Sequence, residues 1–263
     1  MLTLHKNIYL GTVVDATDAE GFHIGRVSYK GDGSCDDMHC HENPHISFVL
    51  KGGNIEKRKN TEFERFPGRV TFYQSGEPHQ NIYKSAGSSH INIELAPSYL
   101  KDNLLDAVKI EAHCRLNPDI KFLILKIYKE LLIDDDFSGC SIKLLLLELL
   151  SGDRQLPAQR PAWINMLEQV LNDRWNEVLS LQDLSAMVGV HPITISKHFS
   201  RYFNCTIGEY MRKLRINRAI ALVKSSRTSL TDISYECGFA DQSHFTRTFK
   251  YMTGFLPRQY QRL

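Results

Sequence analysis

The sequence predicts an α+β protein of two domains, and three observations lead to this prediction. Its 263 residues exceed the roughly 100 to 200 residues of a usual single domain. Up to about Leu95, short runs of β-branched and aromatic residues alternate with Gly, Asn and Ser clusters, as in an all-β domain. From Pro97 onward the apolar residues recur at helical spacing. A mainly β part with trailing helices is therefore expected before an all-α part.

The individual elements follow from the same patterns. Strands are expected at residues 46–50, 70–73 and 91–95, and three helices between 97 and 152, built around residues 100–108, 122–131 and 142–150. Residues 151–161 contain two prolines and few large apolar side chains, which is typical of a linker. The predicted domains are therefore residues 1–155 and 163–263.

Composition and charge narrow the class of protein. The 42% hydrophobic and 24% charged residues are ordinary for a globular chain. No apolar run approaches the roughly 18 residues of a membrane span, and no signal peptide is present, so we expect a cytoplasmic protein without membrane association. Six cysteines without a CxxC pair favour reduced thiols. They are Cys35, Cys40, Cys114, Cys140, Cys205 and Cys237.

Charge is divided unevenly along the chain, although the total is only +2. From Arg160 onward there are 14 Lys and Arg against 8 Asp and Glu, a net charge of +6, which leaves −4 for the first part. A basic C-terminal domain is typical of a protein that binds a polyanion, although surface charges can also separate without function.

The C-terminal part contains an internal repeat. Ser180-Leu-Gln-Asp183 aligns with Ser229-Leu-Thr-Asp232, and each has an N-cap Ser with an acidic N3 residue that opens a helix. Gly189 matches Gly238 at the same offset, where a sharp turn needs the left-handed conformation that glycine adopts freely. After one extra residue, the matches are Ile195 with Phe245, Lys197 with Arg247, Phe199 with Phe249, Asn204 with Gly254, and Tyr210 with Tyr260.

Each copy of the repeat predicts a helix-turn-helix unit, because a short helix, a turn after Gly and a second basic helix follow one another. Between the copies, Thr206-Ile-Gly-Glu209 predicts a capped linker helix that runs to about Lys224 and spans roughly 28 Å. Major-groove faces lie about 34 Å apart along B-DNA, so one chain could present both second helices to one duplex. The linker helix carries basic residues that could contact phosphates or be solvated, namely Arg212, Lys213, Arg215 and Arg218.

The most specific pattern lies in the second copy. It comprises Asp232-Ile-Ser-Tyr-Glu-Cys-Gly-Phe239, Asp241-Gln-Ser-His-Phe-Thr-Arg-Thr-Phe-Lys250, Thr253-Gly254 and Pro257-Arg-Gln-Tyr260. With these segments, residues 163–263 resemble the DNA-binding region of the AraC/XylS family of bacterial regulators. Leu256 departs from the family, which usually has Ser or Thr before this proline, so the last helix could be capped differently. The resemblance implies binding of promoter or operator DNA and contact with RNA polymerase.

In that family the second helix of each unit enters the major groove, which here implies residues 192–203 and 241–252. Ile195 and Phe199 should face the core, as should Phe245 and Phe249. The outward candidates for DNA contact are Thr194, Ser196, Lys197, His198 and Arg201, with Gln242, Ser243, His244, Thr246, Arg247 and Lys250. Arg247 could read guanine bidentately or contact a phosphate. His198 and His244 could instead be packing or capping residues.

The N-terminal part carries four histidines in a recognisable spacing. His39-Cys-His41 is followed by His45 and then Gly52, which resembles the first cupin motif with His at the usual Glu position. A second cupin-like segment runs from Gly68 through Gly76 to His79, with Gln74 and Tyr83 replacing the usual proline and asparagine. The resemblance implies a cupin-like β-barrel as a sensor domain, before a C-terminal domain of two helix-turn-helix units joined by a linker helix.

These histidines have three interpretations. Strand alternation would turn His39 and His41 the same way into the barrel, with His45 and His79 on neighbouring segments. Neutral imidazoles at that spacing suit a divalent metal such as Zn, Ni, Fe or Mn. The same side chains could instead line a pocket for an organic effector, or be ordinary packing or surface residues. Cys40 would face the opposite way and is not expected to be a ligand.

The two-domain layout predicts a sequence-specific DNA-binding transcription regulator, an activator by family habit, controlled by a small effector in the barrel. The alternatives are a metal-dependent cupin enzyme fused to a DNA-binding domain, and an architectural DNA-binding protein with a vestigial barrel. No nucleophile and base are paired in the sequence and no phosphate-binding loop is present, so no enzyme and no catalytic residue are expected. The leucines around residues 144–150 could form a homodimer surface or pack within their own domain.

Overall fold

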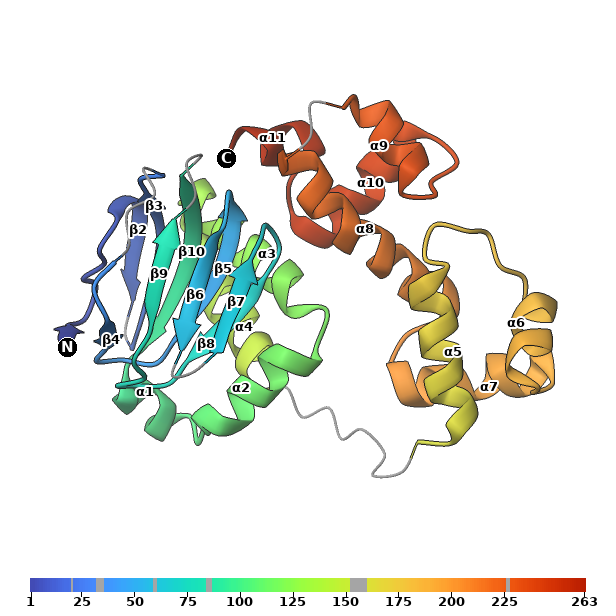
Figure 1. The fold of residues 1–263 in the computed structure, drawn as a ribbon, viewed down its shortest axis with the longest axis horizontal. Coiled ribbons are helices and arrows are strands. Elements are labelled where there is room, and N and C mark those ends of the chain that lie inside the picture. Colours follow the sequence, from blue (N-terminus) through green and yellow to red (C-terminus); the bar gives the residue numbers. More distant parts are fainter. Residues whose placement is uncertain (20, 32–35, 59–60, 84–86, 152–159, 226–227) are drawn as a thin grey trace. The chain divides into compact units, whose positions relative to one another are not determined.

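The computed structural model describes residues 1–263 except 20, 32–35, 59–60, 84–86, 152–159 and 226–227 (Figure 1). The chain divides into two compact units, which are described separately below. The first comprises Met1–Gly152 with the short segments Thr253–Phe255 and Gln259–Leu263. The second comprises Asp153–Met252 with Leu256–Arg258. Most of the expected linker, residues 152–159, and Cys35 lie outside the described residues, and the other five cysteines form no disulfide bond with one another.

The described residues of the first unit form ten strands. They are β1 (Leu2–Leu4), β2 (Thr12–Ala19), β3 (Phe22–Tyr29), β4 (His39–His41), β5 (His45–Lys51), β6 (Asn54–Arg58), β7 (Thr61–Arg65), β8 (Val70–Tyr73), β9 (Gln80–Tyr83) and β10 (Ser88–Leu95). They form a five-stranded antiparallel sheet β2-β3-β10-β5-β8, a three-stranded antiparallel sheet β7-β6-β9 and a parallel pair β1-β4. The predicted strands correspond to β5, β8 and β10, so the expected β domain is confirmed.

The described strands do not close into one barrel. The five-stranded sheet ends at β8 and the three-stranded sheet ends at β7, and no ladder joins these two edges. Elsewhere, the backbone amides of His39 and His79 each donate to the other residue's carbonyl, at 3.0 and 2.9 Å, and link β4 to the segment before β9. The expectation of a mainly β N-terminal domain is therefore confirmed. The described strands do not form the closed barrel that the cupin resemblance implied.

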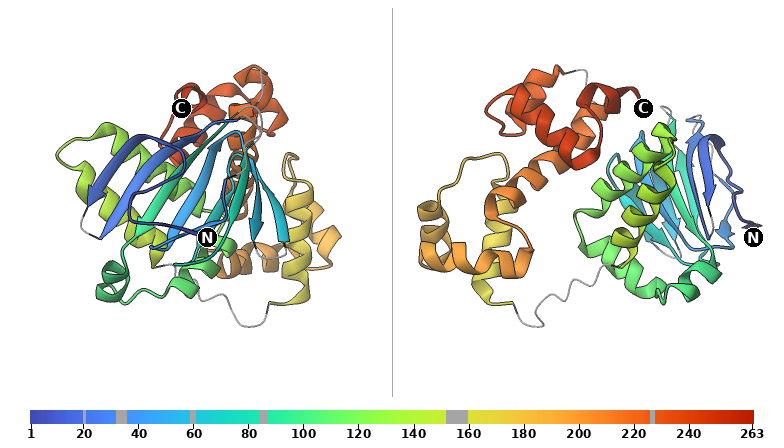
Figure 2. Two further views of the ribbon diagram at one scale, coloured as in Figure 1. Left: turned by 60° about the vertical axis from the view of Figure 1, so that its left-hand side comes forward. Right: turned by 180° about the vertical axis from the view of Figure 1, so that it is seen from behind.

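The central strand β10 is buried along its whole length because it is covered on both faces. His90 and Asn92 line an internal cavity, whereas Ile91 and Ile93, which point the other way, are fully buried. The views in Figures 1 and 2 show helices α3 (Ile120–Ile133) and α4 (Ser138–Leu150) lying against one face of the five-stranded sheet. His90 and Asn92 therefore lie on the face of β10 opposite to these helices.

Four helices follow the strands, not three. The first expected helix is divided into α1 (Pro97–Asp102) and α2 (Ala107–Leu116). Leu104 has a positive φ of 55° and is 95% exposed, so it leaves the helical path between them. The carboxylate of Asp106 then caps α2 by accepting from the backbone N–H of Val108 at 2.8 Å. Local capping overrides the apolar spacing that predicted one continuous helix.

All the secondary-structure elements from residue 160 onward, among the described residues, are helices. They are α5 (Ala162–Asp173), α6 (Leu181–Val188), α7 (Pro192–Phe203), α8 (Ile207–Ser225), α9 (Leu230–Glu236), α10 (Gln242–Thr253) and α11 (Pro257–Arg262). The two helix-turn-helix units are α6–α7 and α9–α10, joined by the predicted linker helix α8. None of the helices built from described residues is long and apolar enough to cross a membrane.

The repeated positions adopt the backbone conformations that the repeat predicts. Ser180 caps α6 by accepting from the N–H of Asp183, and Ser229 caps α9 by accepting from the N–H of Asp232, both at 3.1 Å. All four turn residues have positive φ values between 52° and 80°, namely Gly189, Asn204, Gly238 and Gly254. Asn and Gly are the residues that occupy this left-handed region most readily. The predicted turn positions are confirmed.

Candidate DNA-binding helices and histidine cluster

The imidazoles of His39, His41 and His79 come together inside the first unit. They are 3%, 6% and 2% exposed, and one ring nitrogen from each lies within 4.8 Å of the others. His39 and His41 leave β4 on the same side, with ring centroids 5.5 Å apart, and His79 faces His39 at 4.3 Å. Three of the four expected histidines thus form a group whose donor atoms could hold one metal ion.

His45 lies beside this group instead of within it. Its ring is 4.3 Å from that of His41 and 6.4 Å from that of His79. The ring also stacks on Tyr73, with centroids 4.4 Å apart and planes 7° from parallel. Its Nδ1 is buried without a hydrogen-bond partner among the described residues. His45 therefore lies next to the three-histidine group, and its ring is stacked on Tyr73.

Backbone carbonyls orient two of the three grouped imidazoles. Nδ1 of His39 lies 2.8 Å from the carbonyl oxygen of Asp37, and Nδ1 of His79 lies 3.1 Å from that of Glu77. A carbonyl oxygen only accepts, so each Nδ1 carries a proton, and Nε2 is the nitrogen that offers a lone pair in the neutral ring. Such outer contacts are the usual means by which proteins fix metal-binding histidines.

Burial holds His41 and His79 in the neutral form. Burial is the main reason that the pKa of His41 is lowered from 6.5 to about 4, and the neighbouring imidazole of His39 contributes in the same direction. Burial likewise lowers the pKa of His79 to about 2. A metal ion binds the unprotonated imidazole, so little proton release would be needed at neutral pH.

The cavity at these histidines is small. Its volume is about 20 Å³, and its walls are largely polar because they also include Tyr9, Asn81 and His90. A single water needs roughly 10–15 Å³, whereas small-molecule pockets measure roughly 300–1,000 Å³. The space therefore accommodates one ion or one water, but not an organic effector.

A buried polar network next to His45 was not anticipated from the sequence. The Tyr73 hydroxyl donates to Glu56 Oε2 at 2.8 Å and accepts from Arg65 Nη1 at 2.8 Å. Glu56 is fully buried and also pairs with Arg58. Glu56 and Arg58 are two residues apart on β6 and so share a face, but only the strand register shows that this face is internal.

The second helix of each helix-turn-helix unit buries the side predicted to face the core. Ile195 and Phe199 of α7 are 0% and 1% exposed, and Phe245 and Phe249 of α10 are both 0% exposed. Six of the outward candidates are exposed, namely Ser196, Lys197, Arg201, Ser243, Arg247 and Lys250. Thr194, His198, Gln242, His244 and Thr246 are partly buried. The helical spacing therefore predicted the two faces correctly.

Four basic side chains on these outward faces have no partner among the described residues. Lys197 and Arg201 on α7, and Arg247 and Lys250 on α10, take no part in the hydrogen bonds or ion pairs formed by the part of the chain that the structure describes. Nearby side chains are engaged: Gln242 accepts from the Thr231 hydroxyl at 2.6 Å, and His244 packs edge-on against a phenylalanine ring. Unpaired cations on two equivalent helices are suited to contact with a polyanion.

Comparison with known proteins matches the C-terminal region. A family model described as a helix-turn-helix domain covers residues 184–263. The HTH-type transcriptional activator RhaS of Escherichia fergusonii is 30% identical over 111 residues, which are 42% of this chain and 38% of that protein. Residues 184–263 form an AraC-type helix-turn-helix domain. The chain covers less than half of the length of the curated relatives that it matches.

Two solved structures with some likeness to this chain are the following. A transcriptional regulator from Chromobacterium violaceum, described by its AraC-type DNA-binding domain, is 26% identical and covers 38% of this chain and 89% of that chain, with a TM-score of 0.36. ToxT from Vibrio cholerae is 11% identical and covers 92% of this chain and 98% of that chain, with a TM-score of 0.38.

The linker helix α8 leading into the second half of the AraC-type domain uses its basic residues for internal contacts. Arg215 donates from Nε to the carbonyl of Trp175 at 3.1 Å and from Nη2 to that of Glu177 at 2.9 Å. Arg218 lies over the Trp175 ring, and Lys213 pairs with Glu209 on the same helix. Sequence alone left phosphate contact and solvation open for these residues. The structure shows that Arg215 anchors the turn after α5, and the spacing along α8 gives no signal of this contact.

Proposed function

We propose that this protein is a sequence-specific DNA-binding transcription regulator that inserts α7 and α10 into neighbouring major grooves of promoter or operator DNA. The observation that supports the proposal most directly is the set of unpaired cations on the outward faces of two equivalent helices in an AraC-type domain. The contacts would come from Thr194, Ser196, Lys197, His198, Arg201, Gln242, Ser243, His244, Thr246, Arg247 and Lys250. Arg247 is assigned to base readout, because a guanidinium can pair bidentately with guanine.

The experiment is selection of a binding site from random duplex DNA, followed by titration of the full-length protein. Arg247→Ala should weaken binding to the selected site by about 1–3 kcal/mol and relax preference at one base position. Lys101→Ala, an exposed lysine on α1, serves as the control and should leave binding unchanged. A uniform loss across all sequences would assign Arg247 to a phosphate instead, and the absence of any selected site would overturn the regulator proposal.

We infer that the first unit is a cupin-like sensor that holds a divalent metal ion, such as Zn, Ni, Fe or Mn. His39, His41 and His79 would be the ligands, with His45 beside them. The donor set, the carbonyls that leave Nε2 free and the ion-sized cavity support this assignment. The metal or its absence would change the affinity of the DNA-binding domain, and a tenfold change needs only about 1.4 kcal/mol of differential binding.

Elemental analysis of the purified full-length protein tests the metal proposal. The wild type should carry a stoichiometric metal, and the His39→Ala/His41→Ala variant should lose it. The control is His5→Ala, because His5 is exposed and pairs with Glu42 at the surface. Metal in neither protein would reject the metal site while leaving the DNA-binding proposal intact, since the latter depends on the other unit.

The regulator is further proposed to act in the cytoplasm as a homodimeric activator that contacts RNA polymerase. Helix α4 supports dimerisation: Leu146, Leu149 and Leu150 are buried, whereas Leu144 and Leu147 are 64% and 39% exposed. One set of leucines thus packs internally and the other remains available. Sedimentation at micromolar concentration should give a dimer mass for the wild type and a monomer mass for Leu144→Glu. A monomeric wild type rejects the dimer.

A further inference from the structure

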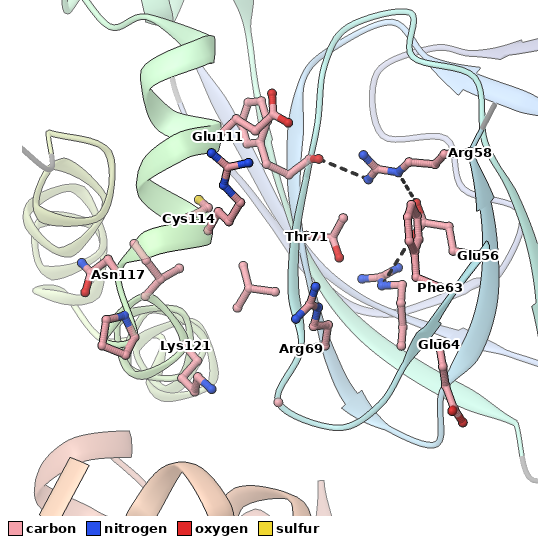
Figure 3. Close-up of a pocket in the computed structure, with 17 residues that line it drawn as sticks. Glu56, Arg58, Phe63, Glu64, Arg69, Thr71, Glu111, Cys114, Asn117 and Lys121 are labelled. Atoms are coloured by element: carbon pink, nitrogen blue, oxygen red, sulfur yellow. Dashed lines mark hydrogen bonds and ion pairs between the residues drawn. The ribbon is translucent and has the colours of Figure 1, made fainter. Parts of the chain in front are cut away.

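A second cavity lies where the two sheets fail to join. It has a volume of about 310 Å³ and opens between the edges of β7 and β8, with α2 and the start of α3 forming its far wall (Figure 3). This is within the roughly 300–1,000 Å³ range of small-molecule sites. It is more than ten times larger than the space at the histidines, so an organic ligand would fit here and not there.

The acidic side chains at this cavity are already paired. Glu56 is fully buried and is held by Arg58 and by the Tyr73 hydroxyl. Glu111 accepts from the side-chain amide of Gln74 at 2.7 Å. In Figure 3, Glu56 and Arg58 face each other on the sheet side and Glu111 lies on the helix side. Each of these two carboxylates therefore has a protein partner, and Glu64, the third acidic side chain of the lining, is not without a partner either.

Two arginines at the same cavity are not paired. Arg69 precedes β8 and Arg115 lies in the last turn of α2, and both side chains are exposed. Neither guanidinium has a hydrogen bond, ion pair or ring contact with any residue that the structure describes. Two uncompensated guanidinium groups on opposite walls form an arrangement suited to an anion, since arginine can bind a carboxylate through two parallel N–H···O bonds.

Apolar side chains contribute part of the remaining lining, beside the polar residues Thr71 and Asn117. The large aromatic side chain of Phe63 is 41% exposed and lines the cavity. Val70, Pro118 and Ile120 contribute further apolar surface. A ligand that satisfied only the arginines would leave this surface in water. The site therefore favours a molecule with one anionic group and an apolar body.

From this arrangement we propose that the cavity between β7, β8 and α2 binds an organic carboxylate with an apolar body, whose carboxylate is held by Arg69 and Arg115. As a binding site it is independent of the metal and of DNA. As an effector site it rests on the proposed regulatory function. Arg65 lines both this cavity and the small one at the histidines, so the two sites share a residue.

The test uses anilinonaphthalene sulfonate, a fluorescent organic anion whose sulfonate stands for the carboxylate, with the full-length protein. Phenylbutyrate should displace it and the uncharged phenylbutanol should not. Arg69→Gln/Arg115→Gln should weaken probe binding by about tenfold or more, because charge-assisted hydrogen bonds are lost. Lys51→Gln/Lys101→Gln removes the same charge from exposed lysines elsewhere in the unit and should bind as the wild type does.

Equal probe affinity in the arginine variant and the wild type, equal displacement by the acid and the alcohol, or no saturable probe binding would each overturn the proposal. Metal content and DNA affinity are measured on the same samples without probe, where the arginine variant should match the wild type. Arginine-dependent probe binding in a protein that does not bind DNA would leave this site standing and reject the proposed regulatory function. Probe binding that depends on arginine but leaves DNA affinity unchanged would establish a ligand site that is not an effector site.

Discussion

The ring of Tyr73 stacks on the imidazole of His45, with centroids 4.4 Å apart and planes only 7° from parallel. The phenol of the same tyrosine reaches away from the histidines, donating to Glu56 and accepting from Arg65. Burial is the main reason that the pKa of Tyr73 is raised, so the hydroxyl stays protonated and acts as a donor. One side chain thus joins the histidine cluster to the buried charges beside the larger cavity.

Tyr73→Phe keeps the stacked ring but removes this link. Glu56 Oε2 and Arg65 Nη1 would each lose a buried partner, which we expect to cost about 1–3 kcal/mol of unfolding free energy. Urea unfolding with the same slope and a lower midpoint would show it. The matched control is Tyr235→Phe, because Tyr235 is 59% exposed and should change stability little. Equal stability of wild type and Tyr73→Phe would mean that water replaces the hydroxyl.

Two turn glycines offer a matched comparison of backbone strain and steric overlap. Gly189 and Gly238 occupy equivalent places in the repeat, with φ values of 67° and 73°. A Cβ at Gly189 meets no atom within 4 Å, whereas one at Gly238 would overlap the carbonyl of Asn176. Gly189→Ala should therefore cost only the left-handed strain of about 1–2 kcal/mol. Gly238→Ala should cost clearly more, as measured by urea unfolding, and equal losses would contradict the overlap with Asn176.

The repeat predicted these turns because the information is local. Capping residues, helical spacing and glycine at a turn lie within a few residues of one another, so α6, α7, α9 and α10 could be located from the sequence. The inward placement of Phe245 and Phe249 follows from the same spacing. The break between α1 and α2 is also local, but the apolar spacing around Leu104 conceals it until the capping by Asp106 is considered.

The interior of the first unit could be predicted only in part. The spacing of His39 and His41 placed them on one face, and the motif brought His79 to them. The position of His45 beside the group depends on how β5 pairs with β8, which places His45 opposite Tyr73. Glu56 and Arg65 resemble surface charges along the chain. Their burial depends on the pairing of β6 with β9 and on the contacts of Arg65 with Ser47 and Tyr73, which periodicity does not encode.

Stability of the metal-free protein should fall as the pH falls. The pKa of His41 is about 4 in the folded chain and 6.5 as a reference value, chiefly because of burial. Between these values the unfolded chain binds a proton that the folded chain excludes, so stability is fully present above pH 6.5 and is lost towards pH 4. Urea unfolding between about pH 7 and pH 5 should show this decline.

The contribution of His41 to that decline can be isolated. His41→Gln should flatten the dependence of stability on pH. Glutamine does not titrate, so the unfolded chain no longer binds a proton at this position that the folded chain excludes. Burial also lowers the pKa of His45 and of His90, so a smaller slope of the same sign should remain. His5→Gln is the control, since His5 is exposed, and it should keep the wild-type slope. An unchanged slope in His41→Gln would show that this imidazole is protonated in the folded state.

The lysines at the ends of the recognition faces should act on DNA through charge alone. Lys197 on α7 and Lys250 on α10 are exposed and carry no partner within the described chain, which suits contact with phosphates. Each phosphate contact contributes about 0.9 to the slope of log affinity against log salt on duplex DNA. Lys197→Ala and Lys250→Ala should therefore each lower that slope by about 1 and weaken specific and random DNA equally. Loss of affinity at the selected site with an unchanged slope would instead place these side chains on base edges.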